Sequence, residues 1–197
     1  MSEKRNILKS TFVTQTQGYL DISRRVEIWK SICNTFNGKF DISHTKSSDI
    51  QTLKLKIQHK QWELKLTESD AKPLKVEVVF NKLIDYNLTI SQEDIFEKIM
   101  KLFGAKEIEV RRQEFDNKYF INSNSKNITL MILTPQLVDK ILNCSIYSLS
   151  YTSGSNDNLS NLVAVVHRNI DTETALAAIV NLFIEMIDNL KANRIIE

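Results

Sequence analysis

The chain is poor in residues that break regular structure or build specialised loops. Its 197 residues include four glycines and two prolines. So few of both exclude a collagen-like, linker-rich or low-complexity organisation. The glycines stand at positions 18, 38, 104 and 154. That spacing is too wide for the glycine-rich loops that bind nucleotide phosphates.

Metal-binding residues are also scarce. The only cysteines are Cys33 and Cys144, and the only histidines are His44, His59 and His167. No pair of cysteines has CxxC spacing, and no histidine has a cysteine or carboxylate at a ligand spacing. The sequence therefore predicts no metal site and no cofactor. Two thiols that pack as apolar side chains favour a reducing compartment, so we expect a cytoplasmic protein.

The charge is almost balanced, and long apolar runs are missing. Lysine and arginine number 26 against 24 acidic residues, which gives a net charge of +2. A field this weak argues against binding to nucleic acid or anionic lipid. Polar residues interrupt every apolar stretch, and no signal-length run follows the N-terminus. We therefore expect no membrane or nucleic-acid partner.

What the chain does have is clear apolar periodicity. Between residues 20 and 36, apolar side chains recur in steps of three and four, which predicts an amphipathic helix. The same spacing recurs between residues 171 and 192 and predicts a long C-terminal helix. Further helices are predicted at 92–103 and 125–143. The second of these restarts at Thr134-Pro135, with threonine as the N-cap and proline at the first helical position.

Alternation of apolar and polar residues predicts strands between the helices. The predicted strands are 39–43, 53–57, 62–66, 76–80, 86–90, 106–111, 117–122, 147–151 and 159–167. Hairpin connections outnumber crossovers, which favours antiparallel pairing. We predict an α+β fold with a predominantly antiparallel sheet and packed helices. A polar arm at 1–18 would precede a single domain at 19–197, with two halves, 19–90 and 91–197, as the alternative.

No catalytic motif is present, so an active site would have to be assembled by folding. The best candidates are Glu107, Glu109, Asp116 and His167. Glu107 and Glu109 share one face of a predicted strand, about 7 Å apart. An enzyme built on these four residues is our alternative hypothesis. Such an enzyme should bring two or more of these residues into one cleft, and at least one of them should have a strongly perturbed pKa.

Other polar residues fit structural roles better. Trp62 alternates out of phase with Lys65, so it points to the core and leaves the lysine face without the aromatic residues of an RNA-binding sheet. Cys33 lies on an apolar helix stripe and is expected to pack there. We expect the following charged and polar side chains to be solvated: Arg24, Arg25, Lys54, Lys56, His59, Lys60, Lys65, Arg111 and Arg112.

One stretch resembles a group of small uncharacterised bacterial proteins. In that group a helix ending in Lys-Leu-Phe-Gly leads to an acidic strand and then to the motif F-D-x-x-F/Y-x-I-x-S/G-N. Here the corresponding residues are 94–104, 106–110 and 115–124, and the similarity covers roughly residues 86–190. Arg111 and Arg112 depart from it, because glycine and small polar residues are expected there. The resemblance implies no activity and assigns no site residue.

The same motif has a physical interpretation. Phe115, Tyr119 and Ile121 share one parity, which predicts that they face the core. Asp116 and Asn124 are suited to accept hydrogen bonds from backbone N–H groups at a strand start and before a helix at Ser125. We therefore interpret the motif as structural first and as a ligand contact second.

The leading functional hypothesis is a non-catalytic cytoplasmic module that binds a partner protein or a small ligand. Such a module should display an exposed apolar patch or a well-formed pocket. The C-terminal helix carries more apolar residues than one stripe needs, among them Leu182, Ile184 and Ile187. Either the helix lies deep in the fold, or part of it packs against a second copy in a homodimer.

Overall fold

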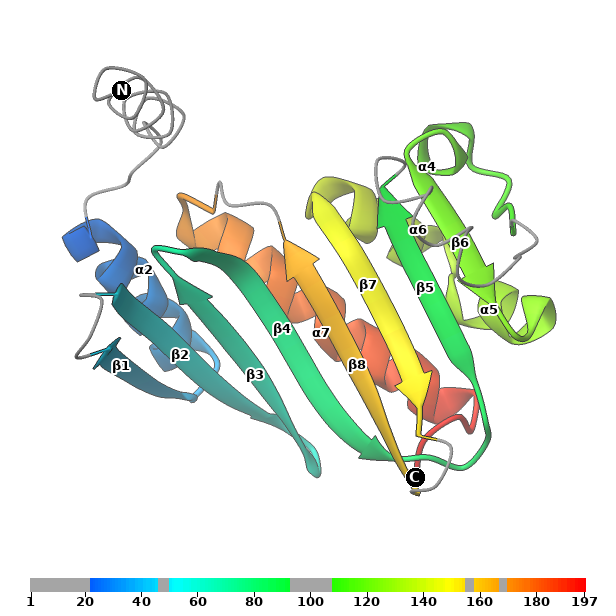
Figure 1. Cartoon of the computed structure of the whole chain (residues 1–197), viewed down its shortest axis with the longest axis horizontal. Helices are drawn as coiled ribbons and strands as arrows, with labels where there is room; N and C mark the ends of the chain where they lie inside the picture. The colour runs from blue at the N-terminus through cyan, green and yellow to red at the C-terminus, as the bar shows by residue number, and fades with distance from the viewer. Residues whose placement is uncertain (1–21, 46–49, 93–107, 155–157, 167–169) are drawn as a thin grey trace, which may run out of the picture.

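The computed structural model describes residues 22–45, 50–92, 108–154, 158–166 and 170–197. In these residues eight strands form one sheet, in the order β1-β2-β3-β4-β8-β7-β5-β6 (Figure 1). The strands are β1 (Lys39–Thr45), β2 (Ile50–His59), β3 (Trp62–Ser69), β4 (Lys72–Asn81), β5 (Asn87–Gln92), β6 (Tyr119–Ser123), β7 (Ile146–Ser153) and β8 (Leu159–Val166). The helices are α2 (Ile22–Thr35), α4 (Gln113–Asp116), α5 (Lys126–Ile132), α6 (Pro135–Asn143) and α7 (Glu173–Ala192).

Every pairing in the sheet is antiparallel, which confirms the predicted α+β class. Strands β1 to β4 form a meander, and the β7–β8 hairpin lies between β4 and β5. Residues 82–86 therefore run from β4 past the ends of β8 and β7 to reach β5 (Figure 1). Strands from both predicted halves belong to this one sheet. The predicted arm at 1–18 and the helix segment 93–103 lie outside the described residues.

The large helices cover one face of the sheet. Helices α2 and α7 cross behind it, and α2 and α6 each contact α7 (Figure 1). The strands alternate accordingly: in β4, Val76 and Val78 are buried while Lys75 and Val79 are exposed. Period-two alternation of this kind is what a sheet with one packed and one solvated face requires.

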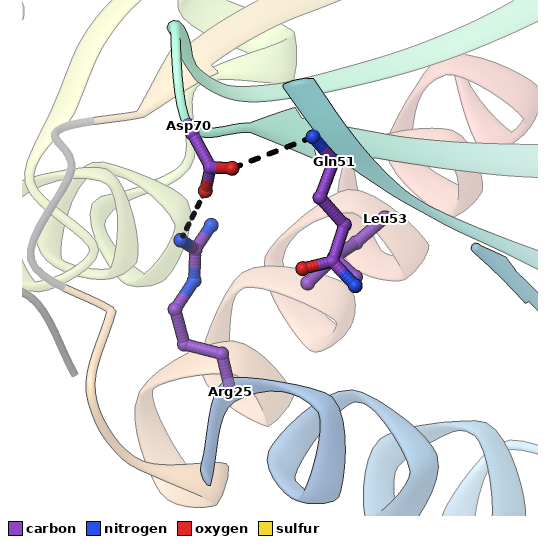
Figure 2. A pocket seen from close by; sticks show the side chains of 4 residues that line it. All are labelled: Arg25, Gln51, Leu53 and Asp70. Atoms are coloured by element: carbon purple, nitrogen blue, oxygen red, sulfur yellow. Dashed lines mark hydrogen bonds and ion pairs between the residues drawn. The ribbon is translucent and has the colours of Figure 1, made fainter. Parts of the chain in front are cut away.

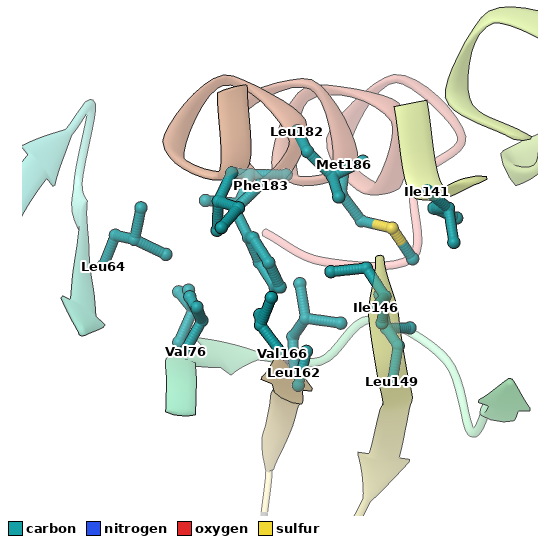
Figure 3. Packing of buried hydrophobic residues seen from close by; sticks show 14 of the residues in the cluster. Leu64, Val76, Ile141, Ile146, Leu149, Leu162, Val166, Leu182, Phe183 and Met186 are labelled. Atoms are coloured by element: carbon teal, nitrogen blue, oxygen red, sulfur yellow. The ribbon is translucent and has the colours of Figure 1, made fainter. Parts of the chain in front are cut away.

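The centre of the core lies between α7 and the sheet. Figure 3 shows Phe183 of α7 directed toward Val76 and Val166, and Met186 directed toward Ile146. Leu182 and Ile187, two of the additional apolar residues of this helix, are also buried within the chain. The long helix therefore lies deep in the fold, as the first of the two explanations proposed. Ile184, the third of these additional apolar residues, is only partly buried.

Helix ends follow the predicted chemistry. The Ser125, Thr134 and Thr172 side chains cap α5, α6 and α7 by accepting hydrogen bonds from backbone N–H groups. Pro135 opens α6, so the predicted helix at 125–143 is two helices that meet at Leu133. Each cap satisfies an N–H group that the helix itself leaves without a partner.

The strand predicted at 106–111 is wrong over residues 108–111, the part of it that the structure describes. Residues 108–111 make no strand, although the Ile108 N–H donates one hydrogen bond to the Ile121 carbonyl at 3.1 Å. The Asp116 carboxylate instead folds this segment into a turn, because it accepts hydrogen bonds from the Val110 and Arg112 N–H groups. Arg111 has a φ of 62° inside that turn. A side-chain contact thus competes successfully with a strand ladder.

The core position of α7 gives a stability prediction. Replacing Phe183 or Trp29 with alanine should lower the free energy of unfolding by about 3–5 kcal/mol, because each removes a large buried side chain and leaves a cavity. Urea titration measures the change, with Asn181→Ala on the exposed side of α7 as the control. A loss below about 1 kcal/mol for either core variant would contradict its core assignment.

Candidate functional site

Of the four residues proposed for catalysis, Glu109 and Asp116 lie in the part of the chain that the structure describes. Asp116 uses both carboxylate oxygens on backbone N–H groups, at 2.9 Å from Val110 and 3.0 Å from Arg112. This confirms its predicted capping role and makes it a structural residue. Glu109 is exposed, whereas Glu107 and His167 lie outside the described residues. Asp116 and Glu109 therefore form no acid–base pair.

Asn124 and the aromatic residues of the same motif are also structural. The Asn124 side-chain oxygen accepts a hydrogen bond from the Asn87 N–H at the start of β5, at 2.9 Å. Phe115, Tyr119 and Ile121 are buried, as their parity predicted. The Tyr119 hydroxyl donates to the Ile146 carbonyl, and burial raises its pKa to about 12. The motif therefore joins β5, β6 and β7 and leaves no polar group for a ligand at Tyr119.

Arg25 joins α2 to the open end of the β2–β3 hairpin, where β2 begins and β3 ends. The prediction that Arg25 is solvated is therefore wrong. Its guanidinium lies 3.1 Å from the Glu68 carboxylate and 3.3 Å from that of Asp70. Figure 2 shows Asp70 between this guanidinium and the Gln51 N–H, which donates to it at 3.4 Å. The Arg25 side chain is only 14% exposed. This site is a small hollow filled by its own ion pairs.

His59 and Lys60 fix the other end of the β2–β3 hairpin to α7. His59 Nε2 lies 2.9 Å from Asp188 Oδ1, and Lys60 Nζ donates to the same oxygen at 2.7 Å. The prediction of a solvated His59 is therefore wrong, since its side chain is mostly buried against α7. Partial burial opposes ionisation of Asp188, but the hydrogen bonds from His59 and Lys60 outweigh it and lower the pKa of that carboxyl.

An open groove of about 630 Å³ lies between α6 and α7. Its lining residues are Lys140, Asn143, Cys144, Ala178, Asn181, Ile184, Glu185 and Asp188. Lys140 and Glu185 form an ion pair with each other. Burial raises the pKa of the Cys144 thiol to about 11, so it stays protonated at neutral pH and is a poor nucleophile. With Asp188 bound by His59 and Lys60, the titratable groups of this lining are already engaged within the chain.

A second surface feature is an apolar tip at one end of the sheet. Among the described residues, six large hydrophobic side chains are exposed, and four of them lie where β4 ends and β8 begins. We define the apolar tip as Val79, Leu83, Ile84 and Leu159, which are 37–50% exposed. Val79 and Leu159 are diagonal neighbours on the open face, because Asn81 pairs with Leu159 and Val79 with Asn161. Leu130 and Met131 of α5 are the other two.

The loop that carries half of the tip is held firmly. The Lys82 N–H donates to the Asn158 carbonyl at 2.8 Å, and the Leu83 N–H donates to the Ile195 carbonyl at 2.9 Å. The Tyr86 N–H donates to the Ser153 hydroxyl at 3.0 Å. Leu83 and Ile84 are thus displayed on a fixed backbone. The sequence analysis did not single out these two residues, because they lie in a loop that has no apolar periodicity. Two adjacent aliphatic residues in a loop could still have indicated an exposed apolar site.

The basic face of the sheet is solvated, as predicted. Lys56 and Lys65 both lie within ion-pair distance of Glu63, and Lys75 pairs with Glu77. Trp62 is buried on the opposite face. In the ranges that the structure describes, no three histidine, cysteine or acidic side chains cluster as metal ligands. The helices in those ranges also include none that is long and apolar enough to cross a bilayer.

The Arg25 cluster gives a mutational prediction. Arg25→Met should destabilise the fold by about 3 kcal/mol, because it leaves the buried Glu68 carboxylate without its guanidinium partner. Adding Glu68→Gln should recover part of that loss, since a neutral amide then replaces the carboxylate that has lost its guanidinium. Equilibrium unfolding of the two single variants and the double variant measures the coupling. Strictly additive losses would show that the pair is not coupled.

Asp188 gives a pH prediction. Its folded-state pKa is lowered, so its contribution to stability is complete above the unfolded value of about 3.9 and is lost as pH falls through the folded value. Asp188→Asn should therefore be less stable than the wild type at pH 6, by under about 1 kcal/mol for so exposed a group. The difference should shrink below about pH 4. Unfolding curves at pH 6 and pH 3 test this, and a difference that does not change with pH contradicts it.

Comparison with known proteins supports the fold. Neither a family model nor a curated protein sequence matches the chain. Among solved structures it is similar to the mycobacterial trehalose monomycolate transport factor A, TtfA, with a TM-score of 0.52 and 7% sequence identity. The similarity covers 84% of this chain and 93% of that one. At this identity the likeness shows a shared fold and assigns no function.

Proposed function

We propose that this chain is a non-catalytic module that binds a partner protein through the apolar tip. The observation that carries the proposal is the exposure of Val79, Leu83, Ile84 and Leu159 at one end of a well-packed sheet. Exposed aliphatic residues on a backbone fixed by hydrogen bonds are typical of docking surfaces, because little ordering entropy is lost on binding. We also propose that the protein is cytoplasmic and bacterial. The bacterial origin rests on the resemblance of the motif at 115–124.

The chemistry of the ionisable groups supports binding over catalysis. Asp116, Asp188 and the Lys140–Glu185 pair are each engaged in contacts that join elements of the fold. The enzyme alternative on Glu107, Glu109, Asp116 and His167 loses Asp116 to the backbone. TtfA, which has a similar fold, is a transport factor, and this is compatible with a binding role for the fold. We carry neither its cargo nor its partners over to this chain.

The groove between α6 and α7 supports the small-ligand form of the hypothesis less well. Its ionised side chains already pair with one another or with the β2–β3 turn. A polar ligand would have to replace those contacts, whereas the tip needs no internal contact to be broken. We therefore favour a protein partner with a complementary apolar surface.

Site-specific photocrosslinking tests the proposal. A photoreactive amino acid at Leu83 should give an adduct with one protein in cells. The same group at Leu130 of α5, which is 42% exposed against 50% for Leu83, should not. The captured protein is then purified and its binding measured by calorimetry. Leu83→Ser/Leu159→Ser should weaken binding roughly tenfold or more, because exposed apolar anchors dominate such interfaces.

The matched control is Leu130→Ser, which should leave the dissociation constant unchanged. Thermal unfolding of each variant confirms that the fold is intact. Equal labelling from positions 83 and 130, or unchanged affinity of the Leu83→Ser/Leu159→Ser variant, would contradict docking at the tip.

A further inference from the structure

The two edges of the sheet differ in how they are protected. On the β6 side, the Ile108 N–H donates to the Ile121 carbonyl, so the outer edge of this five-residue strand is partly covered. On the β1 side, Lys39–Thr45 pairs with β2 through seven consecutive residues without a bulge, and no other described strand pairs with it. Sheet edges are normally blunted by bulges, prolines, charged side chains or covering segments, since their free N–H and C=O groups accept another strand. The exposed Lys39 and Asp41 are the charges that β1 carries.

Apolar side chains beside this edge are only partly covered. Phe40 and Ile42 face the helix side of the sheet, because they pair with the buried Leu55 and Leu53. Both are half-buried, and so are Val26 and Cys33 of α2. Trp29 lies over Phe40, with 6.2 Å between ring centroids. An added strand with apolar residues on the helix side would complete this incomplete end of the core.

Charge along β1 indicates what the added strand should carry. Lys39 lies opposite Lys56 in the β1–β2 register, and like charges directly opposite each other destabilise a pair. Lys56 has a partner in Glu63 at 3.1 Å, whereas the ion pairs among the described residues include none for Lys39. Lys39 is exposed at the edge. A carboxylate placed opposite it from the open side would therefore be favourable.

We propose that β1 pairs antiparallel with β1 of a second copy of this chain, about a two-fold axis at Phe40. Phe40 and Ile42 must keep to the helix side, so the axis can pass only through a residue of β1 and not between residues. An axis at Asp41 would place Asp41 opposite itself. An axis at Ile42 would place Lys39 opposite Thr45 and leave its charge without a partner.

The axis at Phe40 places Lys39 opposite Asp41 of the second copy, and the same pair forms twice. It also stacks the two Phe40 side chains on the helix side, where aromatic pairs across strands are favourable. The carboxylate that Lys39 needs is thus supplied by the chain itself. Charge complementarity selects this register and a second copy as the occupant of the edge.

The helices fit the same arrangement. Because Trp29 lies over Phe40, the two-fold axis brings the α2 helices together antiparallel near Trp29. Val26 precedes Trp29 by three residues and Cys33 follows it by four, so Val26 of each copy faces Cys33 of the other. These half-buried apolar side chains then contact each other in place of water.

Single cysteine substitutions test the register. Residues opposite each other in antiparallel strands have Cα atoms about 4.5–5.5 Å apart, which suits a disulfide. Under mild oxidation, Phe40→Cys, which keeps Lys39 and Asp41 and lies opposite itself in this register, should give a covalent dimer on non-reducing gels that dithiothreitol reverses. Ile42→Cys, which reports an axis at Ile42, is the matched control. On the same gels it should give mainly the band of a single chain, as should the wild type, whose dimer is not covalent.

A charge variant tests the same interface without oxidation. Lys39→Glu should raise the dimer dissociation constant at least about tenfold in sedimentation equilibrium, because it faces Asp41 of the second copy with a like charge. It should not lower the melting temperature of the monomer, since the introduced carboxylate would then face Lys56. A monomer of 22.8 kDa at all concentrations up to millimolar overturns the proposal. So does a disulfide formed only by the Ile42→Cys control, or a dimer that Lys39→Glu leaves unchanged.

Discussion

The burial of α7 against one face of the sheet is the constraint on which the rest of the structure depends. Phe183 and Met186 fill the space above β4, β8 and β7, and α2 and α6 cover the flanks of α7. A helix that contacts the sheet and other helices needs an apolar surface wider than a single stripe, and this explains the additional apolar residues of α7. The opposite face of the sheet carries lysines, glutamates and small polar residues, together with the exposed Val79 and Leu159 of the apolar tip.

Much of this could be predicted because the signals are local. Periods of two and of three to four residues found the strands and helices, and the caps at Ser125 and Thr134 found their starts. The order of the strands could not be found, since nothing local indicates that β7 and β8 separate β4 from β5. Arg25 and His59 were misjudged for the same reason: their partners Asp70 and Asp188 lie 45 and 129 residues away.

Some charged groups of the surface are held in contacts within the chain, whereas other surface regions expose apolar side chains or a strand edge that pairs with no further described strand. The Arg25 cluster and the Asp188 contacts hold the two ends of the β2–β3 hairpin, so their charges are no longer free for chemistry. The apolar tip and the β1 edge lie at different places on the sheet and offer different contacts, side chains at one and backbone at the other. The two proposed interfaces thus use different strands, β4 and β8 at the tip and β1 at the edge.

The β7–β8 hairpin, which lies between β4 and β5 in the sheet, also governs the order in which the chain can fold. During synthesis the β1–β4 meander emerges first, but the outer edge of β4 stays open until residues 159–166 leave the ribosome. Helix α2, which packs on β1 and β2, emerges before the meander, whereas α7, which packs over β4, comes later still. Contacts of such long sequence separation slow folding and expose a nascent sheet to intermolecular pairing. Nascent chains of this protein therefore have a defined interval in which a chaperone would be most useful, and it closes only when the last helix docks.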